Sequence, residues 1–135
     1  MRCVLNYGPG EEDLVSGVKA ASGEAAPIAY NGSLSQLMAL LRNAACIVGG
    51  DTGPLHLAVA LGTPAVAIFG PTDPARNGPY RMGGRPCGDS PTDIVLRSPQ
   101  AVTTYKRGGQ PASSILEIHV DTVFNAVNRL VEVRR

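Results

Sequence analysis

The sequence predicts an α/β fold with a Rossmann-like parallel sheet and helices on both faces. Short apolar runs of strand length alternate along the chain with segments whose apolar residues recur at helical spacing. Two of these runs, 44–48 and 64–70, flank a segment with its own helix start and stop signals, which is the pattern of a β-α-β unit. Strands joined in this way lie parallel in one sheet, because the connecting helix brings the chain back to the same end.

Composition is typical of one globular domain. Of the 135 residues, 44% are hydrophobic and 17% charged, and 16 glycines and 11 prolines mark many turns. The net charge of +1 provides no field that would attract nucleic acid or an anionic membrane, so neither is expected as a partner. No apolar run reaches the roughly 18 residues of a membrane span, and no secretion signal is present at the start. We therefore expect the protein in the cytoplasm.

The cysteines and histidines indicate no metal site. Cys3, Cys46 and Cys87 are odd in number and widely spaced, so they predict neither a disulfide framework nor a zinc site. His56 and His119 are too far apart in sequence for a local pair of ligands. Cys46 lies in an apolar run and is expected to be buried as a small hydrophobic residue.

The chain begins with a strand and an acidic helix start. A strand is expected within 1–7, followed by a turn at 8–10 and a helix that begins near Glu11 and Glu12 and ends at 22–23. Acidic residues in a first turn offset the helix dipole, and this alone explains the two glutamates.

A second strand and helix come next. The strand is predicted at 27–30, and the polar turn 31–33 caps the helix that follows. Its apolar residues form one inward stripe. They are Leu34, Leu37, Met38, Leu40 and Leu41.

The helix inside the β-α-β unit is placed by its end signals. Thr52 can cap its start, Pro54 suits its first position, and Gly62 followed by Pro64 ends it. The helix is therefore about nine residues long.

Polar residues gather at the start of this helix. Asp51 follows the strand, Thr52 offers a hydroxyl, and His56 lies in the first helical turn, while Gly50 and Gly53 let the backbone approach a ligand. Backbone N–H groups and the positive end of the helix dipole point to the same place, which favours phosphate. The alternative is a structural turn, in which Asp51 and Thr52 only cap the helix and His56 packs.

The remaining chain is irregular until its end. The loop 70–80 leaves the carboxyl end of its strand at the same edge as the Asp51 loop. We expect a further loop at 81–92, a short strand at 94–96, and a long mobile connection at 98–114.

A terminal helix is predicted after that connection. Asp121 caps it, and Arg134 and Arg135 suit its carboxyl end. One face is apolar. Its residues are Val123, Phe124, Val127, Leu130 and Val131.

Three blocks of this sequence resemble the signature of the heptosyltransferases, glycosyltransferase family 9. They read DTGPLHLA at 51–58, GTP at 62–64 and FGPTDP at 69–74. Two weaker likenesses are VLNYGPGEE at 4–12 and DTV at 121–123. The resemblance therefore covers most of the chain.

The resemblance implies the GT-B architecture, in which two Rossmann-like domains face each other across a cleft. This chain resembles the carboxyl-terminal domain, which binds the nucleotide-sugar. It is expected to be a single domain over 1–135 that lacks its own first strand and helix and the whole amino-terminal domain.

The resemblance also implies roles for individual residues. Asp51 would hydrogen-bond the sugar. Thr52, Gly53 and the helix start at Pro54 and His56 would hold the pyrophosphate.

Two further pairs are expected at the nucleoside. Glu11 or Glu12 would reach the ribose hydroxyls, and the backbone at Gly32 and Ser33 would lie against the base. No catalytic residue is identified, because the family's acceptor-activating acid lies in the amino-terminal domain. The family's phosphate-binding segment, which contains Lys and Thr, would lie on the strand and helix before the strand that contains Cys3.

The implied reaction transfers a sugar from a nucleotide diphosphate to a lipopolysaccharide core acceptor, with no cofactor or metal. ADP-heptose is the expected donor, and GDP- and UDP-sugars stay open. The chain alone is expected to bind the donor weakly and to transfer no sugar. It is also expected to self-associate. The complete enzyme could lie at the inner face of the membrane. The alternatives are a non-catalytic nucleotide-binding or assembly module, and a different GT-B donor domain of the epimerase-like or N-acetylglucosamine-using kind.

Overall fold

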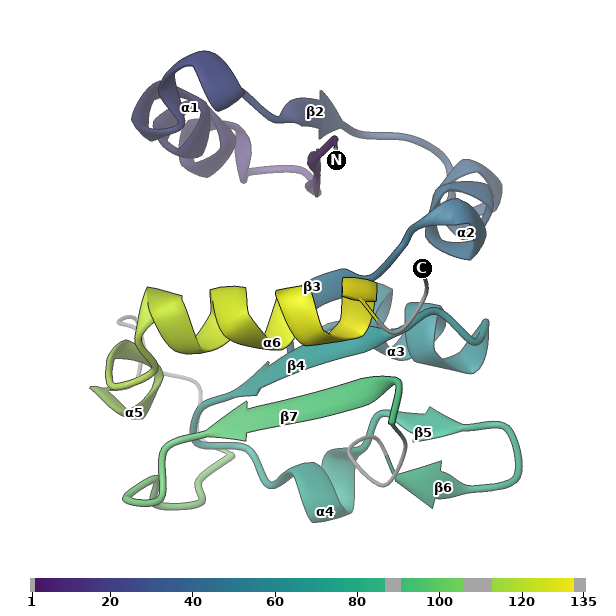
Figure 1. Ribbon diagram of the computed structural model, residues 1–135, viewed down its shortest axis with the longest axis vertical. Helices are drawn as coiled ribbons and strands as arrows, with labels where there is room; N and C mark the ends of the chain where they lie inside the picture. The colour runs from purple at the N-terminus through teal and green to yellow at the C-terminus, as the bar shows by residue number, and fades with distance from the viewer. Residues whose placement is uncertain (1, 87–90, 106–112, 133–135) are drawn as a thin grey trace. The chain divides into compact units, whose positions relative to one another are not determined.

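The computed structural model describes residues 2–86, 91–105 and 113–132. The chain divides into two compact units, Met1–Gln36 and Leu37–Arg135, and each is described by itself (Figure 1). The single domain expected from the sequence stays a prediction.

The first unit contains one β-α-β unit. Strand β1 (Val4–Asn6) pairs in parallel with β2 (Ile28–Tyr30). Helix α1 (Glu12–Ala21) and the short 3-10 helix η1 (Gly23–Ala25) connect them. The strands and the helix lie where the sequence predicts them. No residue of α1 is buried, so this unit has little core of its own.

Helix α2 (Leu34–Asn43) crosses the boundary between the units. The turn before it caps it as predicted, since the Ser33 hydroxyl accepts from the Gln36 N–H at 3.3 Å and the Gln36 side chain accepts from the Ser33 N–H at 2.9 Å. Leu34 was expected to point inward, but its side chain is 66% exposed. It occupies the first helical position, and the buried residue of α2 is Leu41.

The second unit is built on a parallel three-stranded sheet of order β3-β4-β7. The strands are β3 (Ile47–Gly50), β4 (Ala65–Phe69) and β7 (Asp93–Arg97). Helix α3 (Gly53–Ala60) joins β3 to β4, which confirms the predicted β-α-β unit. Gly62, with φ of 85°, follows this helix in the left-handed region that glycine adopts most easily.

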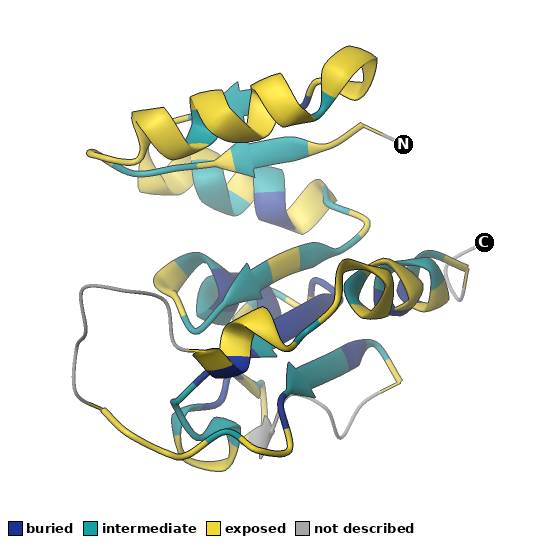
Figure 2. Cartoon of the chain, turned by 90° about the vertical axis from the view of Figure 1, so that its left-hand side faces the viewer, coloured by how far each residue is buried: buried dark blue, intermediate teal, exposed yellow. Residues whose placement is uncertain are grey.

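The central strand β4 supplies the core on both faces of the sheet. Successive side chains of a strand point to opposite faces. Ala65, Ala67 and Phe69 pack with Leu55 and Val59 of α3. On the other face Val66 packs with α6 (Val120–Glu132). All but one of the β4 residues are fully buried (Figure 2), and the helices cover both faces, as the sequence predicts.

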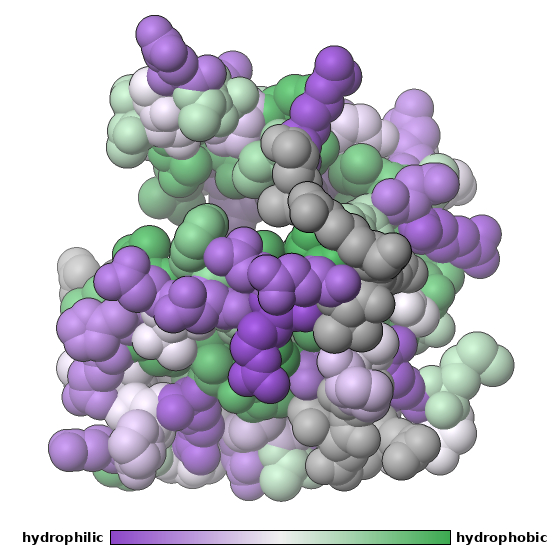
Figure 3. All heavy atoms as spheres, viewed as in Figure 1, coloured by the Kyte–Doolittle hydropathy of each residue, from purple (hydrophilic) through white to green (hydrophobic). Residues whose placement is uncertain are grey.

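Helix α6 buries most of the expected stripe, since Leu130 is buried and Val123 and Val127 pack against the same core, but Phe124 does not belong to it. Ala126 and Leu130 are buried, whereas Phe124 is 62% exposed. Each residue turns the helix by about 100°, so a residue one position off the inward stripe faces outward. Figure 3 shows mainly hydrophilic side chains over the outward face of α6. Asp121 lies inside the first turn and is not the cap, because α6 begins at Val120.

Besides η1, two short strands and two one-turn helices were not predicted. The strands β5 (Tyr80–Arg81) and β6 (Arg85–Pro86) form an antiparallel hairpin, most of which lies in the segment 81–92 that was expected as a loop. Positive φ angles at Gly83 and Gly84 make its tight turn possible. The others are the one-turn helices α4 (Pro74–Asn77) and α5 (Ser113–Leu116).

Several expectations concern other residues. Cys46 is half-buried against the β4–α6 core, not fully buried, and Cys3 is exposed. Cys87, the central part of the 98–114 connection, and Arg134 and Arg135 lie outside the described residues. Within the described ranges, no helix is both long enough and apolar enough to cross a membrane.

Candidate functional site

Two loops of the second unit meet at the carboxyl ends of neighbouring strands. Strands β3 and β4 are parallel and in register, with Gly50 opposite Ile68. The loop that carries Asp51 and the loop that begins at Gly70 therefore leave the sheet at one edge, as predicted. Ligands of open α/β sheets bind at this edge.

The Asp51 carboxylate is the centre of a hydrogen-bond network between these loops. Its Oδ1 lies 2.8 Å from Nε2 of His56, and its Oδ2 accepts from Nδ2 of Asn77 at 2.7 Å. The Thr72 side chain also acts on this carboxyl and favours its ionised form. The Asp51 side chain is 20% exposed and the His56 side chain 37% exposed, so the network borders solvent.

The network keeps Asp51 ionised. Burial acts to raise the pKa of its carboxyl, but the hydrogen bonds from Asn77, His56 and Thr72 and the charge of His56 together outweigh burial. The pKa of Asp51 is therefore lower than its ordinary value. At neutral pH the site presents a fixed carboxylate, which only accepts hydrogen bonds.

Thr52 occupies the N-cap position of α3 but does not cap it with its side chain. Its hydroxyl donates back to the Gly50 carbonyl oxygen at 3.3 Å and makes no bond to the helix. The predicted side-chain cap is therefore wrong, because the hydroxyl is turned toward the strand. Asp51 bonds to side chains instead, so the structural turn in which both residues only cap the helix is not observed either.

The start of α3 is open. Pro54 lies at its first positions, as predicted, and the first helical hydrogen bond runs from the His56 N–H to the Thr52 carbonyl at 3.2 Å. A side chain at Gly53 would meet nothing within 4 Å. A ligand can therefore approach the backbone at Gly53 without displacing protein atoms.

The second loop is shaped by α4, which is capped by side chains at both ends. The Asp73 carboxylate accepts from the Ala75 N–H at 3.0 Å. The Tyr80 hydroxyl lies 2.8 Å from the carbonyl oxygen of Ala75 and 3.2 Å from that of Arg76. Asn77 is the last residue of this helix. Sequence reasoning missed Asn77 and Thr72, although the Asp73-Pro74 pair is a helix-start signal that could have located α4.

The segment after β7 lies against the same loop. The Thr104 N–H donates to the Pro71 carbonyl at 3.0 Å, and the Arg97 guanidinium donates to the Thr103 hydroxyl at 2.9 Å. The Arg76 guanidinium lies 4.4 Å from the centre of the Tyr105 ring. This pairing with Tyr105 raises the pKa of Arg76. The first part of the connection expected to be mobile is thus docked on the α4 loop.

The other predicted site residues belong to the first unit. The Glu11 carboxylate accepts from the Gly8 N–H at 2.7 Å and so closes the turn before α1, while Glu12 lies exposed in the first turn of the helix. A side chain at Gly32 would meet the ends of the Tyr30 and Gln36 side chains, which would have to move to make room for it. Ser33 serves as the cap of α2.

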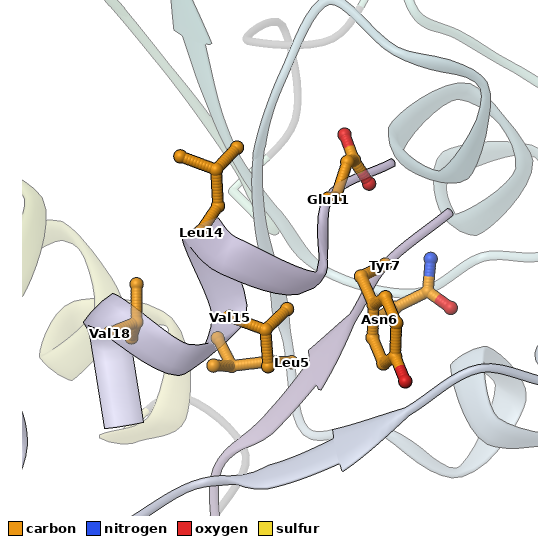
Figure 4. A pocket seen from close by; sticks show the side chains of 7 residues that line it. All are labelled: Leu5, Asn6, Tyr7, Glu11, Leu14, Val15 and Val18. Atoms are coloured by element: carbon orange, nitrogen blue, oxygen red, sulfur yellow. The ribbon is translucent and has the colours of Figure 1, made fainter. Parts of the chain in front are cut away.

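Glu11 also borders a shallow hollow on the first unit (Figure 4). Its volume is about 190 Å³, below the roughly 300–1,000 Å³ of pockets that enclose small molecules. Part of a ligand, but not a whole nucleotide-sugar, fits such a space. It is lined by Leu5, Asn6, Tyr7, Glu11, Leu14, Val15 and Val18.

The structure brings together one of the two predicted groups of site residues. Asp51, Thr52, Gly53, Pro54 and His56 lie in one loop and helix start, joined by the unpredicted Asn77. The residues of the first unit are described separately, so a role for them at this site stays a prediction. In the described ranges, no three or more His, Cys, Asp or Glu residues cluster in a way that could hold a metal ion.

Solved structures share this fold. The chain superimposes on the glycosyl transferase family 9 protein from Veillonella parvula with a TM-score of 0.71 and 26% identity, over 97% of this chain and 36% of that one. It superimposes on E. coli ADP-heptose lps heptosyltransferase II with a TM-score of 0.73 and 23% identity, over 98% of this chain and 37% of the other.

Sequence comparisons agree. The chain is 35% identical over 74 residues to lipopolysaccharide heptosyltransferase 3 of Escherichia coli, a match that spans 52% of this chain and 22% of that protein. It is 38% identical over 76 residues to lipopolysaccharide heptosyltransferase 1 of Pseudomonas aeruginosa, spanning 56% of this chain and 21% of the relative. The matched stretch is thus about a fifth of each relative. The model of glycosyltransferase family 9 (heptosyltransferase) matches residues 8–91, more than half of the chain, and the chain therefore belongs to that family.

Proposed function

We propose that this chain is the donor-binding part of a heptosyltransferase that transfers heptose from a nucleotide diphosphate sugar to a lipopolysaccharide core acceptor. Its family supports the reaction class, and the two curated relatives are named lipopolysaccharide heptosyltransferases. One observation carries the proposal: the Asp51 carboxylate is held by side chains beside the open start of α3.

The start of α3 is the diphosphate site in this proposal. The first N–H groups of a helix have no acceptor within the helix, and its dipole is positive at that end. Gly53 leaves the backbone accessible, and the Thr52 hydroxyl and His56 lie beside it. These groups stabilise the leaving diphosphate as its negative charge develops.

His56 is a ligand contact in this proposal and not the catalytic base. Its Nε2 faces the Asp51 carboxylate, which can only accept, so Nε2 carries a proton. His56 lies in the first turn of α3, beside the proposed diphosphate site, and this place fits contact with the leaving group better than proton removal from the acceptor. We therefore assign acceptor activation to an amino-terminal Rossmann-like half, in the GT-B arrangement, and no catalytic residue to this chain.

ADP-heptose is the proposed donor, since the solved E. coli relative is named for it. Glu11 or Glu12 would contact the ribose, and Gly32 and Ser33 the base. The lipopolysaccharide core is bound through the amino-terminal half, in the cytoplasm or at the inner membrane face. Without that half, exposed apolar side chains such as Phe124 favour self-association.

Asp51→Ala should weaken binding of ADP-heptose more than binding of ADP. Only the sugar is expected to donate to this carboxylate, and a hydrogen bond to a charged group is worth about 1.5–3 kcal/mol. Calorimetric titration of both ligands measures the difference. Asp121→Ala is the control, because it removes an exposed carboxylate on α6. Equal losses for the two ligands would remove the sugar contact from the proposal.

A transfer assay separates the enzyme from its main alternative, a nucleotide-binding or assembly module. The purified chain is incubated with ADP-heptose and a truncated lipopolysaccharide acceptor, with and without a separately expressed amino-terminal half. We expect no transfer by the chain alone and measurable transfer by the mixture, because aligning the reactants contributes about 7–11 kcal/mol to lowering a barrier. Turnover by the chain alone would mean that it contains its own base. No turnover by either preparation would favour the module.

A further inference from the structure

The Asp51 carboxylate has little acceptor capacity left. An ionised carboxylate offers about four acceptor positions. The side chains of His56 and Asn77 occupy two of them, and the Thr72 side chain acts on the same carboxylate. At most two positions remain for a ligand, so the direction in which Asp51 can accept is set by its protein partners.

Two of these partners come from the loop after β4. Asn77 is fixed by the backbone of α4, since its N–H donates to the Asp73 carbonyl at 2.8 Å and the Gly78 N–H donates to the Pro74 carbonyl at 3.0 Å. The caps at both ends of α4 hold this single turn in place. A helix this short is not stable by itself, so its caps and contacts are what keep it folded.

The amide of Asn77 has one orientation that satisfies this site. Its partner only accepts, so the atom at 2.7 Å from Asp51 Oδ2 must be the NH₂ group. The contact joins the two loops that leave neighbouring strands. Asn77 binds Oδ2 of Asp51, whereas His56 contacts Oδ1.

We propose that Asn77, with Thr72, is a positioning residue for donor recognition: it orients the Asp51 carboxylate so that a remaining acceptor position receives one hydroxyl group of the donor sugar. The inference rests on the proposed function, because it assumes that the ligand of Asp51 is a sugar. A purely structural Asn77 would fasten the two loops together and would affect ADP and ADP-heptose alike.

The test compares the two ligands across matched variants of the full chain. Wild type, Asn77→Ala, Thr72→Val and the control Asn125→Ala, an exposed asparagine on α6, are titrated with ADP and with ADP-heptose. We expect Asn77→Ala to lower the preference for ADP-heptose over ADP by about tenfold, the size of one charged hydrogen bond. ADP affinity and the Asn125→Ala variant should stay close to wild type. If Asn77→Ala does not fold, Thr72→Val removes a second partner of Asp51 with little change of shape.

A second readout is the titration of the Asp51 carboxyl carbon by NMR. Loss of the Asn77 hydrogen bond should raise the pKa of Asp51, and this shift shows that the variant has broken the contact. A wild-type chain that prefers ADP-heptose, with an unchanged preference in Asn77→Ala and Thr72→Val, would overturn the positioning role. A wild-type chain with no preference for the sugar would overturn the proposed function itself, and with it the sugar hydroxyl as the ligand of Asp51.

Discussion

Phe69→Ala is expected to lower the free energy of unfolding by about 3–5 kcal/mol. The Phe69 ring is fully buried at the end of β4, packed with Leu55 and Val59 of α3. Removing it deletes the largest fully buried side chain described and leaves a cavity, and neighbours on a strand and a helix can collapse into it only in part.

The chain contains its own control for this prediction. Its other phenylalanine is Phe124, which is 62% exposed on α6. Phe124→Ala should change stability by no more than about 0.5 kcal/mol, as surface substitutions usually do. Urea unfolding of the three proteins, followed by circular dichroism, measures both effects. Similar losses in the two variants would mean that β4 is not the centre of the core.

Arg81→Ala is expected to be comparably destabilising, by about 3–5 kcal/mol, for an electrostatic reason. The Arg81 guanidinium donates twice to the Asp93 carboxylate at 2.5 Å and once to the Thr63 carbonyl at 3.3 Å. The Asp93 side chain is 0% exposed. Without the guanidinium, a buried carboxylate at the start of β7 loses its opposite charge, which costs more than the ion pair itself contributes.

A double-mutant cycle tests this explanation. Arg81→Met combined with Asp93→Leu removes both charges and should lose less stability than the two single variants added together. Arg129→Ala, an exposed arginine on α6, is the control for the loss of a positive charge. If the stability lost by the double variant equals the sum of the losses of the two single variants, an unpaired buried charge does not explain the effect of Arg81→Ala.

The parts of the fold that the sequence predicted have strong local signals. The β-α-β unit is marked by Pro54 near the start of α3 and Gly62 after its end, and these signals act within a few residues. Helix α4 and the β5–β6 hairpin are too short to show any periodicity, so pattern reasoning treated them as loop. Phe124 was predicted to face inward because it follows Val123 directly, and an apolar residue beside an inward stripe cannot be told from a member of that stripe by sequence alone.

The candidate site was predicted in composition but not in its contacts. Asp51 and His56 stood out because polar residues at a helix start favour anions. The hydrogen bond between Asp51 and Asn77 joins residues 26 positions apart, and only the pairing of β3 with β4 brings them together. Thr52 was expected to cap α3, because threonine is favoured at the N-cap position. Its hydroxyl donates to the Gly50 carbonyl oxygen instead.

Because the side chains of β4 point alternately to the two faces of the sheet, its pairing with β3 tolerates no slip in register. A slip by one residue would turn every side chain of β4 to the opposite face. The Phe69 ring would then point away from Leu55 and Val59 of α3. The same slip would shift the loop after β4 by about 3.3 Å along the strand and carry Asn77 away from Asp51. The packing of the core and the geometry of the carboxylate are therefore fixed by one and the same strand register.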